Sequence, residues 1–167
     1  MEIYNLREHL TYIARECETE SAYVADKFAV LVSRYCEGKE CKQIATNSFF
    51  DDNTKVVIVG SNKLEVASFK QYTEKLPGQR ATIDLNVEVI PYNKVQKITK
   101  TYHKLGLNEG VHVFSATIML DNGQTLEISP VKVPDSTSEE QYVSDSGDNA
   151  DFRLYLTDLI DEIESKI

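Results

Sequence analysis

Apolar residues recur every three or four positions near the end of the chain, over residues 148–167, which predicts an amphipathic helix. The stripe consists of Phe152, Tyr155, Leu156, Leu159, Ile160, Ile163 and Ile167. Asp148 or Asn149 can cap the first turn, and the opposite face is acidic. This helix therefore needs an apolar partner surface, which the preceding segments must supply.

Two further helical patterns lie in the N-terminal part of the chain. The first covers about residues 4–17, and the second has its apolar face at Val24, Phe28, Leu31, Val32 and Tyr35. Thr19 or Ser21 can cap the second helix, and Gly38 suits the left-handed position that ends it. We interpret residues 1–50 as a helical hairpin that covers one face of the following domain. If the apolar stripe of these helices were not fully covered by that domain, it would favour a homodimer through the helices.

After residue 51 the pattern changes to the alternation that is typical of strands. The predicted strands are residues 55–60, 64–69, 81–89, 111–120 and 124–129, with turns at 61–63, 76–79 and 121–123. Residues 92–105 fit both helical spacing and strand composition, and we favour a strand. Residues 111–120 are apolar enough to be buried on both faces. Over residues 44–53 the apolar periodicity loosens, and the polar residues at the end of this stretch predict a turn. Residues 130–147 are expected to form an acidic loop.

The predicted fold class is therefore α+β. Residues 1–50 form the helical hairpin, and residues 51–167 form an antiparallel, partly open β-barrel closed by the C-terminal amphipathic helix.

Four stretches carry a resemblance to a known family. They are 56–64 (VVIVGSNKL), 89–95 (VIPYNKV), 118–128 (IMLDNGQTLEI) and 152–163 (FRLYLTDLIDEI). In this order, over about two-thirds of the chain, they resemble the pleckstrin-homology-like (PH-like) domain in its small bacterial form. The resemblance implies a barrel plugged by the last helix and a peptide or protein ligand along an exposed strand or beside that helix.

Two features depart from other PH-like domains. Eukaryotic members usually place a Trp in the closing helix, whereas this chain has none, so Phe152 or Tyr155 would fill that position. Phosphoinositide-binding members cluster Lys and Arg on the first two strands, where this chain has Lys63, Lys70 and Tyr72. Two lysines are too few to hold a multiply phosphorylated head group, so phosphoinositide binding is not expected.

The charge distribution limits the classes of partner. The net charge is -9, and residues 134–167 contribute most of it with 10 acidic and 2 basic side chains. Such a field repels nucleic acid and anionic membrane surfaces. No apolar run is long enough for membrane insertion. The lack of a recognisable secretory signal and the odd cysteine count (Cys17, Cys36, Cys41) predict a cytoplasmic protein with reduced thiols.

No motif with a known catalytic mechanism stands out. His9, His103 and His112 are far apart in the sequence, and no cysteine or histidine spacing matches a metal clip. The sequence contains neither a phosphate-binding glycine loop nor a nucleophile elbow. We therefore predict a non-enzymatic protein without a metal or cofactor. An enzyme with an unrecognised site stays as an alternative.

One basic cluster is a candidate partner surface. It comprises Lys94, Lys97, Lys100, Tyr102 and Lys104, and a groove beside Tyr155 could extend it. The simpler interpretation is a lysine-rich strand edge that discourages edge-to-edge pairing. We predict that this ridge binds a protein or peptide. The alternative is an acidic decoy, in which residues 135–151 and the outer face of the last helix mimic nucleic acid and occupy a basic protein.

Overall fold

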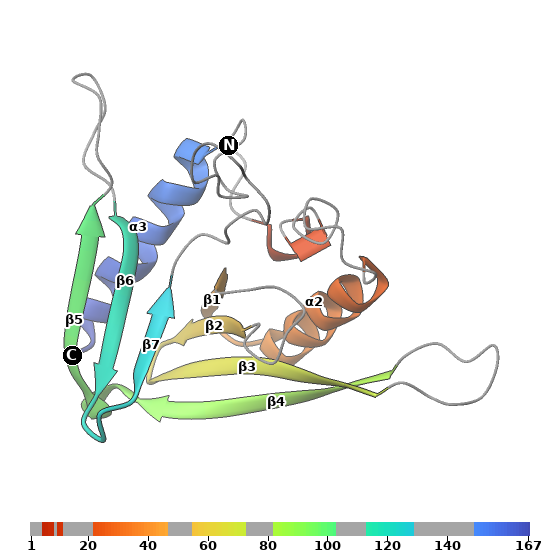
Figure 1. The fold of residues 1–167 in the computed structure, drawn as a ribbon, viewed down its shortest axis with the longest axis horizontal. Coiled ribbons are helices and arrows are strands. Elements are labelled where there is room, and N and C mark those ends of the chain that lie inside the picture. The colour runs from red at the N-terminus through yellow and green to blue at the C-terminus, as the bar shows by residue number, and fades with distance from the viewer. Residues whose placement is uncertain are drawn as a thin grey trace, which may run out of the picture.

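The computed structural model describes residues 5–8, 10–11, 22–46, 55–72, 82–102, 113–128 and 149–167. The fold is mixed α+β, as predicted, with two antiparallel sheets and helices packed against them (Figure 1). Its elements are α2 (Ala22–Cys36), β1 (Cys41–Thr46), β2 (Lys55–Gly60), β3 (Lys63–Tyr72), β4 (Thr82–Pro91), the 3-10 helix η1 (Tyr92–Lys94), β5 (Val95–Tyr102), β6 (Val113–Leu120), β7 (Thr125–Ile128) and α3 (Asn149–Ser165).

The strands form two separate sheets in the described ranges, and no closed barrel is present there. Sheet A has the order β1-β2-β3-β4, and sheet B has the order β5-β6-β7. The predicted hairpin turn at residues 121–123 is confirmed. Gly123 has a φ of 86°, which glycine adopts without strain, and the Leu120 N–H donates to the carbonyl of Gln124 at 2.8 Å.

Strand β1 corrects the prediction of a loosened pattern from residue 44. Cys41–Thr46 pairs antiparallel with β2, and Ile44 and Ala45 are both buried. The adjacent polar residues Lys42 and Gln43 hide the alternation that a strand signal requires. The first strand of sheet A thus comes from the segment that we interpreted as the helical extension.

The N-terminal helices are described only in part. Residues 6–8 and 10–11 are helical, and Leu6 and Leu10 are buried against α2 and sheet A. The rest of the predicted first helix lies outside the described residues, and so do Thr19 and Ser21, the two cap candidates of the second helix. Helix α2 ends as predicted, because it stops at Cys36 and Gly38 follows with a φ of 75°.

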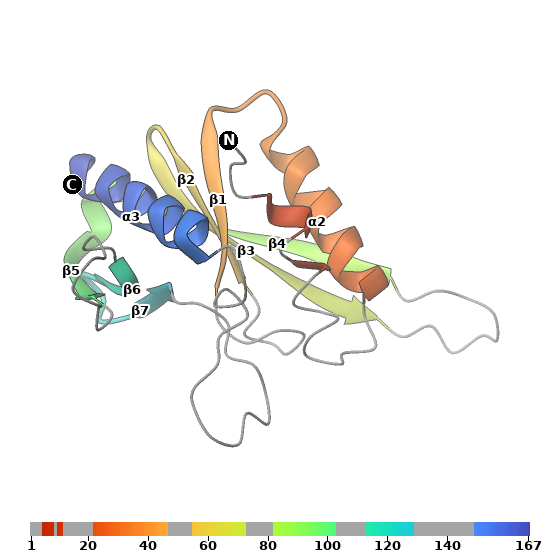
Figure 2. The ribbon, with the colours of Figure 1, turned by 90° about the horizontal axis from the view of Figure 1, so that it is seen from above.

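Sheet A is covered on both faces. Helix α2 packs on one face, next to β4, while α3 and sheet B lie over the other (Figure 2). The α2 core includes Phe28, Val32, Val56, Ile58 and Ala67. The α3 core includes Ile44, Val57, Val59, Leu64, Val66, Ile118, Ile128, Leu156, Leu159, Ile160 and Ile163. Successive residues of β2 therefore serve different cores, which explains its unbroken run of apolar side chains.

Sheet B differs from the prediction in one respect. Residues 92–105 fit both a helix and a strand by sequence, and the strand that we favoured is present as Val95–Tyr102. However, β6 is not buried on both faces. Ala116, Ile118 and Leu120 are buried, whereas Ser115, Thr117 and Met119 are partly exposed, because α3 covers one face of this sheet. No helix within the described ranges is long and apolar enough to cross a membrane.

Candidate partner-binding surface

Strand β5 forms one edge of sheet B. It pairs with β6 and with no other described strand, so one row of its backbone groups faces away from the sheet. Gln96, Lys97, Thr99 and Thr101 are exposed, and the side chain of Tyr102 is 48% exposed. The pairing with β6 shifts register at both ends of the strand. This edge is therefore long, polar and open.

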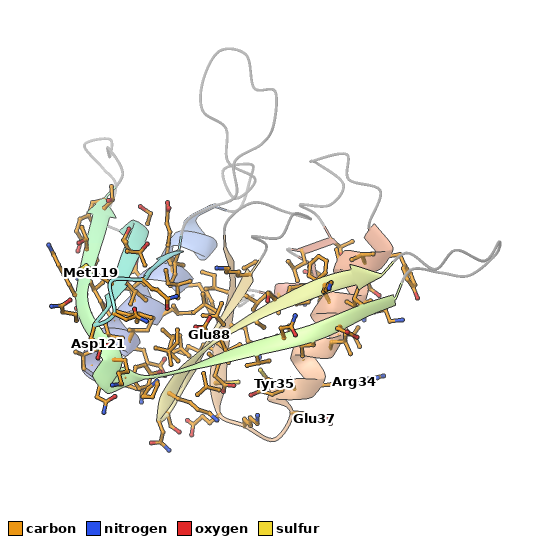
Figure 3. The ribbon with its side chains drawn as sticks, turned by 60° about the horizontal axis from the view of Figure 1, so that its bottom comes forward. Arg34, Tyr35, Glu37, Glu88, Met119 and Asp121 are labelled. Atoms are coloured by element: carbon orange, nitrogen blue, oxygen red, sulfur yellow. The ribbon has the colours of Figure 1, made fainter. Side chains whose placement is uncertain are left out.

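The predicted lysine ridge does not form one uniform row. The ammonium of Lys94 lies 3.5 Å from Asp121, which stands near Met119 at the end of β6 (Figure 3). The ammonium of Lys100 lies 2.7 Å from Glu164 of α3, and this contact raises the lysine pKa. Lys97 has no ion pair with any described residue, and Lys104 lies outside the described residues. Of the ridge lysines that the structure describes, Lys97 is the most available to a partner.

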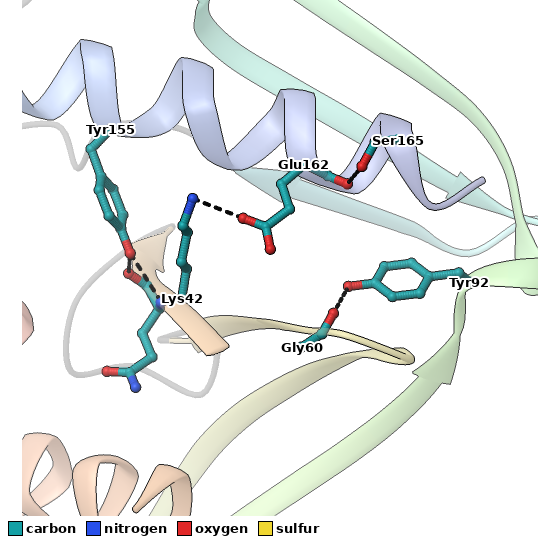
Figure 4. A network of polar contacts seen from close by, with 7 residues as sticks. Lys42, Gly60, Tyr92, Tyr155, Glu162 and Ser165 are labelled. Atoms are coloured by element: carbon teal, nitrogen blue, oxygen red, sulfur yellow. Dashed lines mark hydrogen bonds and ion pairs between the residues drawn. The ribbon is translucent and has the colours of Figure 1, made fainter. Parts of the chain in front are cut away.

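Tyr155 serves the fold at the junction of α3 and β1. Its hydroxyl donates to the carbonyl of Gln43 at 2.8 Å and accepts from the N–H of the same residue at 3.1 Å (Figure 4). These backbone groups lie on the edge of β1 that has no strand partner among the described residues, so the phenol replaces a neighbouring strand. Burial raises the pKa of Tyr155 to about 12.

Two ion pairs also attach α3 to the sheets. Glu162 lies 2.8 Å from Lys42 of β1, as Figure 4 shows, and Glu164 pairs with Lys100 of β5. Helix α3 therefore connects the outer strand of sheet A with the outer strand of sheet B. Two of the carboxylates in the proposed acidic decoy surface are consequently paired within the protein.

Tyr155→Phe is expected to lower the free energy of unfolding by about 1–3 kcal/mol, because two partly buried backbone groups lose their partner while the ring still fills its space. Urea denaturation followed by circular dichroism measures the difference. Tyr102→Phe is the matched control, and we expect a change within about 0.5 kcal/mol from this exposed site. Equal effects of the two variants would contradict the bracing role of Tyr155.

Sequence reasoning missed a buried carboxylate. Glu65 of β3 is 3% exposed and accepts a hydrogen bond from the hydroxyl of Tyr35, which comes from the end of α2 beside Arg34 and Glu37 (Figure 3). This bond is the main cause that raises the pKa of Tyr35 to about 12. The ammonium of Lys63 lies 3.9 Å from Glu65. The sequence did contain a signal of this buried carboxylate. It was a charged residue between the apolar residues Leu64 and Val66, in a strand that is covered on both faces.

Two cysteines lie where α2 leads into β1. Cys36 is buried, Cys41 is partly buried, and no disulfide joins these two cysteines. Burial and the neighbouring Cys41 raise the pKa of Cys36 to about 12, which makes its thiol a poor nucleophile at neutral pH. Within the described ranges no three His, Cys, Asp or Glu residues are placed to hold a metal ion. Cys17 and the three histidines lie outside those ranges.

Comparison of this chain with protein-family models, with curated proteins and with solved structures gave no match. The roles of its residues therefore rest on the geometry described above. That geometry assigns Tyr155 and Lys100 to the attachment of α3, and it leaves Lys97 and Tyr102 on an open strand edge.

Proposed function

We propose that this chain is a PH-like interaction module that binds an extended peptide segment of a partner protein along the free edge of β5. The observation that carries the proposal is an eight-residue edge strand whose outer backbone groups have no partner strand within the described part of the chain. Such an edge can accept an added strand through main-chain hydrogen bonds. The PH-like assignment is supported by the order of four strands, three strands and a final helix.

The other sheet edges are less suited to this role. Tyr155 occupies the backbone groups of Gln43 on β1, and β7 has only four residues. The edge of β4 is long, but it ends in Pro91, and the exposed side chains Asp84 and Glu88 would repel an acidic segment. Strand β5 is the described edge that combines length, exposure and positive charge.

The chemistry of β5 favours an acidic peptide. The ammonium of Lys97 has no ion pair with any residue that the structure describes, and the exposed ring of Tyr102 offers apolar area near the other end of the strand. A ligand with a carboxylate opposite Lys97 would complement this edge within a protein of net charge -9. Main-chain pairing would supply most of the affinity, and the lysine would contribute selectivity.

Peptides selected from a random library against the full chain provide the test. In a binder, each amide in turn is replaced by its N-methyl form, and affinity is measured by fluorescence anisotropy. We expect every second N-methylation to abolish binding, because alternate amides of an added strand face β5. Amide shifts in NMR spectra should concentrate on residues 95–102. A methylation profile without a two-residue period, or shifts centred on β4, would refute the proposal.

Charge variants test the role of Lys97. Lys97→Glu is expected to weaken an acidic peptide up to about fivefold, since exposed ion pairs contribute about 0.2–1 kcal/mol. Lys27→Glu makes the same charge change on α2, on the opposite side of sheet A, and should leave the affinity unchanged. Equal losses in both variants would show that the net charge, rather than β5, attracts the peptide.

A further inference from the structure

A polar depression is lined by residues of the β2–β3 turn, η1 and the end of the chain after α3, and none of its lining residues belongs to β5. It is a shallow depression that is open to solvent, with a volume of about 420 Å³. Ser61 and Asn62 come from the β2–β3 turn, Pro91, Tyr92 and Asn93 from the end of β4 and η1, and Lys166 from the end of α3. Three elements that are remote in the sequence thus meet around one hollow.

Most of the polar side chains around this hollow have no partner among the described residues. Within the described residues, Ser61, Asn62, Asn93 and Lys166 make no side-chain hydrogen bond or ion pair. Tyr92 differs, because it is buried and its hydroxyl donates to the carbonyl of Gly60 at 2.6 Å. This bond ties η1 to the end of β2, so the walls of the depression are held by the fold while their polar groups stay available.

The charges near the hollow favour an anion. Glu162 and Glu164, the acidic residues closest in sequence to Lys166, are paired with Lys42 and Lys100. Two carbonyls in the last turn of α3, those of Ile163 and Glu164, accept backbone hydrogen bonds from Lys166 and Ile167. Lys166 is the one ionised side chain among the six lining residues, and no described residue forms an ion pair with it.

We infer that this depression binds a small soluble molecule through a phosphate or carboxylate group. Lys166 would supply the charge, and the hydroxyl of Ser61 and the amides of Asn62 and Asn93 would supply hydrogen-bond donors from two sides. This site is separate from the peptide edge, so its failure leaves the proposed function of β5 untouched.

Titration of the full-length protein with inorganic phosphate, and separately with acetate, tests the site by NMR. We expect saturable shifts of the backbone amides of Ser61, Asn62, Asn93 and Lys166, and the stronger of the two probes identifies the preferred group. Lys166→Gln should weaken binding about tenfold or more, because it removes a charge-assisted hydrogen bond. The dispersion of the same spectra reports whether each variant is folded.

Lys27→Gln removes one positive charge on the opposite side of sheet A and serves as the matched control. Its affinity for either anion should equal that of the wild type. Shifts that rise linearly without saturation, or equal losses in Lys166→Gln and Lys27→Gln, would overturn the inference. Sedimentation with phosphatidylserine vesicles tests a lipid source. Binding to vesicles without binding to either soluble anion would also overturn it.

Discussion

Phe28→Ala is expected to lower the free energy of unfolding by about 3–5 kcal/mol. Phe28 has an exposed fraction of 0%. The centroid of its ring lies 4.8 Å from the ring centroid of Phe69, with 52° between the ring planes. The substitution removes apolar contacts and leaves a cavity between α2 and sheet A that neighbouring side chains can fill only in part. Urea denaturation followed by far-ultraviolet circular dichroism gives the free energy.

Ser33→Ala on the exposed face of the same helix provides the control for this measurement. We expect it to change the free energy of unfolding by no more than about 0.5 kcal/mol. A decrease in the free energy of unfolding of less than about 1 kcal/mol, with an unchanged denaturant dependence, would contradict the packing of Phe28 between α2 and sheet A.

Ile160→Ala is expected to lower the free energy of unfolding by about 2–5 kcal/mol. Ile160 lies in the middle of the apolar stripe of α3, with an exposed fraction of 0%, and it belongs to the core that joins sheet A and sheet B. Its truncation opens a cavity where both sheets meet the helix. Chemical denaturation measures the loss, and Asp161→Ala, on the exposed side of the helix, is the matched control.

The two core variants also test whether the cores unfold together. Because β2 contributes Val56 and Ile58 to the α2 core, and Val57 and Val59 to the α3 core, we expect one cooperative transition in each variant. Circular dichroism and tyrosine fluorescence should then give coincident curves. Two separated transitions in Ile160→Ala would show that sheet A and α2 form an independent unit.

Much of the secondary structure could be predicted from the sequence, because most elements have a clear period. The stripe of α3, the alternation in β4 and the Asn122-Gly123 turn each favour one local structure. Strand β1 was missed because Lys42 and Gln43 are adjacent polar residues, and its identity depends on pairing with β2. The exposure of one face of β6 likewise depends on what covers sheet B, which no local pattern encodes.

The candidate sites were harder to predict, since they depend on contacts between distant segments. The lysine cluster made β5 a candidate partner surface, but the sequence could not show that Lys100 turns toward Glu164. The sequence suggested a ligand groove beside Tyr155, but it could not show that the hydroxyl of Tyr155 binds the backbone of β1. The depression at Lys166 gathers residues from separate turns, each of which looks like ordinary solvated surface when considered alone.

The contact between Tyr155 and Gln43 spans 112 positions in the sequence, which has a consequence for synthesis on the ribosome. Strand β1 emerges before the other strands, yet the residue that protects its outer backbone groups emerges after all of them. Until α3 docks, the nascent chain presents an unprotected strand edge that can pair with other chains. The outer edge of β1 therefore lacks this protection for at least the time needed to translate the segment between β1 and α3.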